Sequence, residues 1–302
     1  MTITALMLGL ISGLALGSIY LLIALSLTLV LASSGVFNFA QGTVVMAGTV
    51  LSFVLGVRMG WTPLATVSAI MAIGVLGGLL THAIAVWPAM GRSKAFAHTT
   101  VLTTLGLGTA VNAAVALIFG SESWRVPSFI SDNPLHVAGI PVRPIYLAMI
   151  GAGLLITLVI DRVLRRTAMG HMFRSTLEDP EGAMLLGIDV RKIILGSFLI
   201  AGALSGLAGF LIAPVIQASA FTAQELAFLG FAGMAIGGFG SFGGALLGGM
   251  ISGLIAGLAP VLAGPTLTLP ILFVVTVGVL LVRPSGLLGT AGLFGSSRLR
   301  EI

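Results

Sequence analysis

The chain has 302 residues, of which 57% are hydrophobic and only 8% are charged, whereas a soluble domain carries about 25% charged residues. No soluble core of this size could hold so much apolar surface, so the composition excludes an ordinary soluble protein and indicates a membrane protein. The small net charge of +5 argues against nucleic-acid binding, and the lack of cysteine excludes disulfides and cysteine catalysis.

Apolar runs long enough to cross a bilayer, which takes roughly 20 residues in a helix, recur along the whole chain. They lie at Thr4–Leu31, Phe37–Val57, Leu64–Val86, Thr99–Phe119, Ile145–Ile160, Ile193–Ile216, Leu226–Phe239, Gly243–Leu262 and Leu267–Val282. We therefore predict an all-α fold, a polytopic transmembrane helical bundle of eight or nine spans in a single domain over residues 1–302. The second run contains polar residues and the seventh is short, so both are candidates for broken or re-entrant helices.

The basic residues predict the orientation of the bundle, because cytoplasmic loops are enriched in Lys and Arg. Alternating the spans places eleven of the 14 basic residues on one side, namely Arg92, Lys94, Arg162, Arg165, Arg166, Arg174, Arg191, Lys192, Arg283, Arg298 and Arg300. Only Arg58, Arg125 and Arg143 fall on the other side. We expect residues 161–192 to form a cytoplasmic loop, residues 120–143 to form an external loop, and the C-terminus to be cytoplasmic.

A short helix is predicted in the second half of the cytoplasmic loop. Asp179 suits the N-cap, Pro180 the first helical position, and Glu181 the first turn, where an acid favours the helix dipole. Gly187 suits the position that ends the helix. Ala183, Met184, Leu185 and Leu186 lie between them. Such an apolar helix either packs against the bundle or the lipid interface, or docks into another protein.

The same loop resembles the cytoplasmic segment of ATP-binding-cassette importer permeases of the branched-chain amino-acid type. That family has an R-T-x-x-G-x-x-x-R segment, an acidic stretch and an A-x-L-L-G-I-type ending. The residues that match in order and spacing are Arg166, Thr167, Gly170, Arg174, Ala183, Leu185, Leu186, Gly187 and Ile188. The resemblance implies that this segment, together with Asp179, Pro180 and Glu181, is the coupling helix that receives motion from an ATPase subunit.

Three other segments extend the resemblance over most of residues 10–290. Asn38-Phe39-Ala40-Gln41-Gly42 resembles the family's N-F-A-H-G, with Gln41 where the family commonly has His. The glycine-rich stretch 229–249 and the ending 282–289 resemble its L-G-G-x-G-S-x-x-G-A-x-x-G-G and R-P-x-G-L-x-G patterns. In the first segment, Asn38 either caps the following helix or, with Gln41, faces a translocation path.

Two further polar residues, His82 and Asn112, fall inside predicted spans, where polar side chains mark either a transport path or a hydrogen bond between packed helices. Glu225 is expected at the external interface, within reach of a binding protein. No spacing indicates a metal site or a catalytic group, so no enzyme activity and no metal are expected. The phosphate-binding loop G-x-x-x-x-G-K-[ST] is absent, so no cofactor is expected on this chain and ATP would bind to a partner subunit.

The combined prediction is a multi-pass permease subunit in the cell (inner or plasma) membrane, which moves branched-chain or related amino acids with energy from a separate ATPase. The resemblance implies ATPase subunits, a second identical or homologous permease, and an extracytoplasmic solute-binding protein as partners within the lipid bilayer. Urea or amides are alternative substrates of the same permease class. An ion-coupled secondary transporter is the alternative mechanism, although such a protein usually has ionisable groups at the membrane midplane and only His82 is a candidate here.

Overall fold

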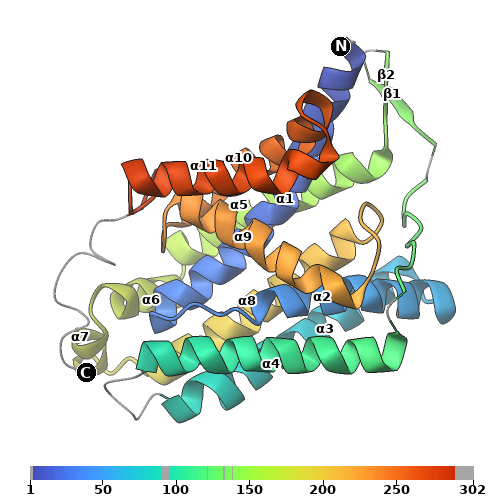
Figure 1. Cartoon of the computed structure of the whole chain (residues 1–302). Helices are drawn as coiled ribbons and strands as arrows, with labels where there is room; N and C mark the ends of the chain where they lie inside the picture. The colour runs from blue at the N-terminus through green and yellow to red at the C-terminus, as the bar shows by residue number, and fades with distance from the viewer. Residues whose placement is uncertain (1–2, 90–95, 121, 132, 138, 290–302) are drawn as a thin grey trace.

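The protein is a helical bundle (Figure 1), and its computed structural model describes residues 3–89, 96–120, 122–131, 133–137 and 139–289. The α-helices are α1 (Ile3–Ser34), α2 (Gln41–Leu51), α3 (Pro63–Thr81), α4 (Phe96–Phe119), α5 (Pro144–Arg166), α6 (Ala168–Glu178), α7 (Pro180–Leu185), α8 (Val190–Ile212), α9 (Ala223–Gly237), α10 (Phe242–Leu262) and α11 (Thr268–Val282). Arg92, Lys94, Arg298 and Arg300, which entered the predicted orientation, lie outside the described residues.

Several shorter elements extend or connect these helices. They are the π-helices η1 (Ser52–Arg58) and η2 (His82–Val86), the 3-10 helices η3 (Trp87–Ala89), η4 (Ala220–Thr222) and η5 (Pro265–Leu267), and the strands β1 (Leu135–Val137) and β2 (Ile140–Val142). The two strands form an antiparallel hairpin in which His136 pairs with Pro141. This hairpin lies within residues 120–143, so the predicted external loop contains the only strands of the described chain.

Nine helical stretches in the described part of the chain are long and apolar enough to cross a membrane, which agrees with the prediction of eight or nine spans. The predicted break in the second span is a change of helix type, because α2 continues directly into the π-helix η1 to give the stretch Gln41–Arg58. The short seventh span is longer than predicted, because η4 leads into α9 and together they cover Ala220–Gly237.

Helix α1 forms the centre of the bundle. It packs against α5, α8, α9 and α10, and every residue from 17 to 33 is buried. Helices α4, α5 and α11 lie at the periphery, where few of their residues are fully buried. The protein therefore presents apolar surface outwards, as the hydrocarbon of a bilayer requires.

Close helix contacts depend on glycine, as the small-residue series at 249, 253 and 257 predicts. Gly253 of α10 faces the backbone of Gly13 and Gly17 in α1. Where α3 crosses α8, Gly74 and Gly202 face each other so closely that a Cβ on either residue would overlap the carbonyl oxygen of the other. At these contacts the helix backbones are so close that a side chain larger than that of glycine would not fit between them.

The two long connections lie at opposite ends of the bundle. Helices α6 and α7 are at one end, and the β1–β2 hairpin is at the other (Figure 1). The chain boundaries agree closely with the predicted external loop, since α4 ends at Phe119 and α5 begins at Pro144. The predicted cytoplasmic loop is more ordered than expected, because α5 extends to Arg166 and residues 168–178 form α6.

Candidate functional site

A chain of buried polar side chains joins three helices around the start of α2. Asn38 Nδ2 donates a 2.9 Å hydrogen bond to Gln41 Oε1. Gln41 Nε2 donates to the Ala201 carbonyl at 2.8 Å and to Ser205 Oγ at 2.6 Å. Ser205 Oγ in turn donates to Ser26 Oγ of α1 at 3.1 Å. Asn38 and Gln41 therefore bond to each other, Gln41 bonds to α8, and Ser205 extends the chain of hydrogen bonds to α1.

The local sequence explains how this chain forms. Gly35 has a φ of 71°, which lets the chain turn sharply after α1. Asn38 Oδ1 then accepts a 3.1 Å hydrogen bond from the Ala40 amide, so Asn38 satisfies a backbone donor ahead of α2 while its amide nitrogen contacts Gln41. Asn38 does not cap α2, because the N-cap position is Ala40 and no side chain bonds to the first amides of the helix. The ring of Phe37 packs between Phe231 and Phe239, at centroid distances of 6.0 and 5.7 Å, and anchors the turn.

His82 and Asn112 do not join this network in the described chain. His82 begins the π-helix η2 and lies edge-on to Phe198, with a centroid distance of 5.5 Å. Its Nε2 is buried without a hydrogen-bond partner, as is Oδ1 of Asn112 in α4. Sequence reasoning missed Ser26 and Ser205, because an isolated serine inside an apolar helix usually bonds to its own backbone and carries no signal of a distant partner.

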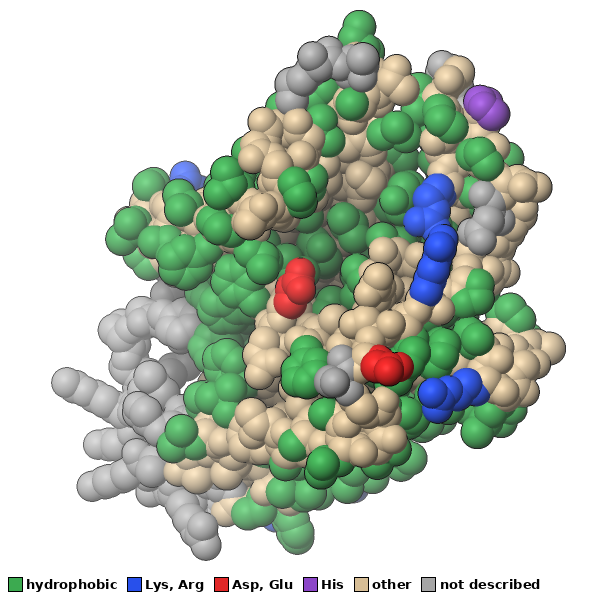
Figure 2. All heavy atoms as spheres, turned by 45° about the vertical axis from the view of Figure 1, so that its right-hand side comes forward, with side chains coloured by type: hydrophobic (Ala, Val, Ile, Leu, Met, Phe, Trp, Pro, Cys, Tyr) green, Lys and Arg blue, Asp and Glu red, His purple; other side chains and the backbone are tan. Residues whose placement is uncertain are grey.

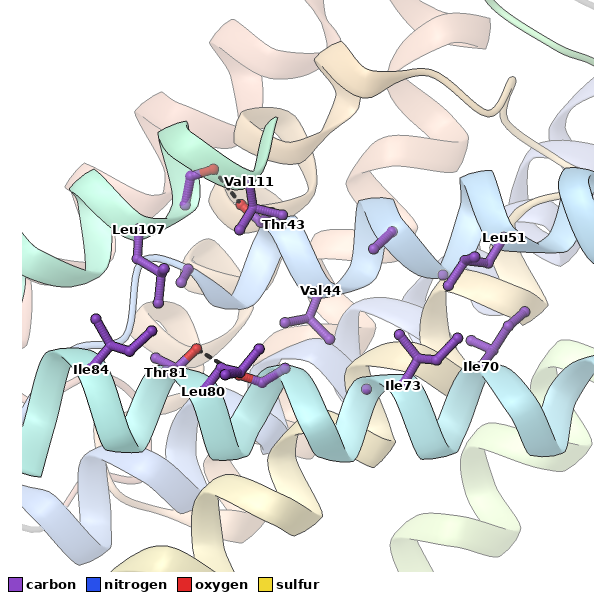
Figure 3. A pocket seen from close by; sticks show the side chains of 16 residues that line it. Thr43, Val44, Leu51, Ile70, Ile73, Leu80, Thr81, Ile84, Leu107 and Val111 are labelled. Atoms are coloured by element: carbon purple, nitrogen blue, oxygen red, sulfur yellow. Dashed lines mark hydrogen bonds between the residues drawn. The ribbon is translucent and has the colours of Figure 1, made fainter. Parts of the chain in front are cut away.

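An apolar pocket of about 220 Å³ lies beside this network, between α2, α3 and α4 (Figure 3). Val44, Ile73 and Leu107 project into it, and no charged residue lines it. Thr43 turns its hydroxyl to the Gly108 carbonyl at 3.4 Å, so even the polar groups on the wall have partners within the helices. This pocket suits hydrocarbon and offers no group that would pair with an ion.

The predicted cytoplasmic loop contains two short helices, α6 and α7. Thr167 caps α6, since its Oγ1 accepts a 3.1 Å hydrogen bond from the Gly170 amide. Gly170 is buried against the backbone of Leu164, so α6 turns back on the end of α5. Phe173 is buried and packs against Phe242 of α10 at 5.9 Å. Helix α6 is therefore held against the bundle by its apolar face.

Helix α7 is short and presents its apolar residues outwards. Ala183 is 2% exposed and faces the protein, whereas Leu185 and Leu186 are 90% and 79% exposed. Gly187, with a φ of 81°, ends the helix, and the Ile188 amide donates a 3.0 Å hydrogen bond back to the Ala183 carbonyl. This is the Schellman arrangement that the glycine predicts.

The N-terminus of α7 differs from the prediction in one detail. Asp179 occupies the N-cap position before Pro180, but its side chain accepts no capping hydrogen bond. Its backbone carbonyl instead accepts from the Ala183 amide at 2.9 Å. The helix ends at Leu185, and the left-handed Gly187 turns the chain out of it, as predicted.

The charged candidates around α7 are exposed. Arg166, Arg174 and Glu181 all lie at the surface. Asp189 caps α8 through a 3.2 Å hydrogen bond from the Lys192 amide, and the Lys192 ammonium lies 3.1 Å from its other carboxylate oxygen. This hydrogen bonding by Lys192 holds the pKa of Asp189 below its usual value. The capped start of α8 therefore follows α7 directly and holds the C-terminal end of α7 in place.

Comparison with known proteins identifies the family. Residues 9–282 match the model of a family described as "Branched-chain amino acid transport system / permease component". The chain belongs to this permease family. The permease is therefore a membrane-spanning component of an ATP-binding-cassette import system, as its sequence motifs predict.

Individual relatives cover most of the permease. It is 28% identical over 296 residues to the "High-affinity branched-chain amino acid transport system permease protein LivH" of Escherichia coli K12, which covers 92% of this chain and 94% of the relative. It is 27% identical over 296 residues to the corresponding protein BraD of Pseudomonas aeruginosa, with 93% and 94% covered. The "Fructose import permease protein FruF" of Bifidobacterium longum is 26% identical over 235 residues, with 74% and 61% covered. No solved structure matches the permease.

Proposed function

We propose that this permease imports branched-chain or closely related amino acids across the inner (plasma) membrane, driven by ATP that separate subunits bind and hydrolyse. Residues 1–302 act as one permease domain and carry no cofactor or catalytic site of their own. The observation that carries the proposal is the exposure of Leu185 and Leu186 on the short, well-terminated helix α7. Two leucines standing free of the bundle need an apolar partner, because exposed apolar area of this kind is unfavourable in water.

In this proposal α7 is the knob that a cleft on the ATPase subunit receives. Ala183 anchors the helix to the permease, and the left-handed Gly187 fixes the direction in which the leucines project. The remaining coupling residues surround this knob and comprise Arg166, Gly170, Arg174, Asp179, Pro180, Glu181 and Ile188. Because α6 packs against α5 and α10, movement of α7 would be transmitted directly to membrane-spanning helices.

The orientation follows from the same assignment. The end of the bundle that carries α6 and α7 faces the cytoplasm, together with the C-terminus, and the β1–β2 hairpin faces outwards. The distribution of basic residues supports this orientation, since Arg162, Arg165 and Arg191 lie towards the α7 end. A second identical or homologous permease subunit covers peripheral apolar helices, and an extracytoplasmic binding protein delivers the substrate at the hairpin end.

The substrate class rests on the relatives. LivH and BraD, whose names give branched-chain amino acids, align over at least nine-tenths of both chains, whereas the fructose permease aligns over a smaller part. The Asn38–Gln41 network lies beside the translocation path, where it couples α2 to α8. His82 and Asn112, with buried unpartnered atoms, are further candidates on this path. Urea and amides remain the alternative substrates for a permease of this class.

The coupling proposal is tested with the double variant Leu185→Asp/Leu186→Asp. We expect the ATPase subunits to co-purify with the wild type and to be lost from the variant, because two charges would enter an apolar interface. Leu135→Asp, an exposed leucine of the external hairpin (50% exposed), is the matched control and should retain the ATPase. Amino-acid uptake that survives ATP depletion but stops with an uncoupler would instead indicate ion-coupled transport.

A further inference from the structure

A second pocket opens at the hairpin end of the bundle and has a different lining. It encloses about 370 Å³ between α1, the end of α8, the start of α9 and the external loop. Its rim is polar and includes Ser123, Gln217 and Glu225, all exposed. Figure 2, which turns this end of the molecule forward, shows scattered acidic and basic side chains on a largely uncharged face. We call this cavity the outer pocket.

The floor of the outer pocket is apolar and buried. Ile212, Leu226 and Leu229 line it and are 0%, 2% and 4% exposed. Tyr20, in the buried centre of α1, also lines it and is 5% exposed. The pocket thus leads from the surface to the central helix of the bundle, with polar groups outside and hydrocarbon inside.

The carboxylate of Glu225 has no cationic partner among the described residues. Two guanidinium groups near this end lie over aromatic rings. The Arg58 guanidinium lies 5.3 Å from the ring centre of Phe53, and that of Arg143 lies 5.8 Å from the ring centre of Tyr146. A carboxylate at the rim of a partly buried cavity attracts a positively charged ligand group, because screening by water is weaker there than on open surface.

The external loop is fixed beside this rim. Trp124 and Ala218 exchange two backbone hydrogen bonds of 2.9 Å, and the Trp124 ring stacks on Phe53 at 5.3 Å. Ser123 is therefore held against the pocket by a paired segment. The rim has a defined shape because this loop is attached to the chain that leads into α9.

We propose that the outer pocket binds the substrate amino acid on the external side of the membrane, with Glu225 pairing with its ammonium group and its apolar side chain lying against Ile212, Leu226 and Leu229. The inference rests on the proposed function and adds a binding site and a binding residue to it. Glu225 lies in the first turn of α9, where the positive end of the helix dipole offsets repulsion of the substrate carboxylate. The pocket in Figure 3 is a poorer site for an amino acid, since it offers an ammonium group no charged partner.

The first-turn position alone would also favour an acid at Glu225 for the stability of α9. The two roles differ in one measurable respect. A role in helix stability affects all ligands equally, whereas a role in ammonium binding affects only ligands with an ammonium group. The test therefore compares L-leucine with isocaproate, which has the same side chain and carboxylate but no amino group.

The experiment measures equilibrium binding of tritiated L-leucine to the assembled transporter in lipid nanodiscs, without the binding protein. We expect Glu225→Gln to weaken leucine binding by about tenfold or more, as loss of a charge-assisted hydrogen bond does. Competition by isocaproate should be unchanged, and Glu225→Asp should bind leucine with intermediate affinity. Glu122→Gln removes an exposed acid of the external loop that does not line the pocket, and this variant should bind leucine as the wild type does.

Two results would overturn the inference. One is Glu225→Gln binding leucine as tightly as the wild type, and the other is an equal loss of leucine and isocaproate binding. ATP-driven leucine uptake by the wild-type transporter is measured in parallel. If uptake occurs but the wild type binds no leucine without the binding protein, the outer-pocket site is wrong and the proposed function stands. If the wild type does not take up leucine at all, the proposed substrate class is wrong.

Discussion

Gln41 Nε2 in α2 donates a 2.6 Å hydrogen bond to Ser205 Oγ in α8, across 164 residues of sequence. Both side chains are buried, at 2% and 0% exposed. Through the Ala201 carbonyl and Ser26, the same amide connects the start of α2 to two of the helices that surround it. The start of α2 is thus positioned by polar contacts inside an otherwise apolar bundle.

Replacing Gln41 by Leu should destabilise the permease. The variant would leave the buried Asn38 amide nitrogen without its acceptor, and an unsatisfied buried group costs about 1–3 kcal/mol. Thermal unfolding in nanodiscs should show a lower midpoint. Gln224→Leu makes the same substitution on the exposed face of α9 and should leave the midpoint unchanged. Equal midpoints for Q41L and the wild type would show that the network does not stabilise the fold.

Replacing Gly202 by Ala should separate α3 from α8. A Cβ at this position would overlap the Gly74 carbonyl, and overpacking of this kind costs about 1–3 kcal/mol. Gly196→Ala on the same helix adds a Cβ that contacts nothing within 4 Å and should stabilise α8 by about 0.5–1 kcal/mol. Thermal unfolding of both variants measures the difference. A result in which both shift the midpoint in the same direction would contradict the close α3–α8 contact.

Replacing Gly187 by Ala should impair coupling without removing the leucines. Gly187 has a φ of 81°, and a residue with a Cβ loses about 1–2 kcal/mol in the left-handed region. Helix α7 would then end differently and turn Leu185 and Leu186 away from their partner. Transport-coupled ATP hydrolysis should fall, and Gly187→Asn should recover part of it because Asn tolerates this conformation. Gly106→Ala, at a helical glycine with open space around it, is the control.

Replacing Trp124 by Ala should loosen the external loop. The indole stacks on Phe53 and lies 5.7 Å from the Arg58 guanidinium, and these contacts would be lost. Trypsin should cleave after Arg125 faster in the variant than in the wild type. Trp61→Ala, which removes a 45% exposed indole from the same end of the bundle, should leave that cleavage rate unchanged. Unchanged cleavage in W124A would mean that the Trp124–Ala218 backbone pairing alone holds the loop.

Hydrophobicity alone predicts the helical bundle, because a span must be apolar along its whole length whatever its neighbours are. The termini of α7 are predictable for a similar reason, since Pro180 and Gly187 act through local backbone geometry. The absence of a side-chain cap at Asp179 is not predictable, because an Asp at the N-cap position can adopt a conformation in which its carboxylate does not reach the first amides of the helix.

The hydrogen-bond partners of Asn38 and Gln41 cannot be predicted from local sequence. The sequence predicts that Asn38 and Gln41 need hydrogen bonds, but not that Ser205 and the Ala201 carbonyl accept from Gln41 or that Ser26 extends the network. That choice depends on which faces of α1 and α8 meet, and these helices lie far apart in the sequence. The outer pocket cannot be predicted from the sequence either, since Tyr20 and Glu225 are far apart in the chain and line one pocket only because α1 and α9 pack together.

The central position of α1 has a consequence for biosynthesis. The contact surface of α10 that covers Gly13 is translated about 240 residues after it, which at about 5–20 residues per second is a delay of roughly 10–50 s. During that time α1 has to reside in the membrane without the later helices that enclose it in the finished bundle. Most of its side chains are apolar, and its serines can bond to carbonyls of their own helix. The composition of α1 therefore suits a helix that waits in the membrane as well as one enclosed in the finished bundle.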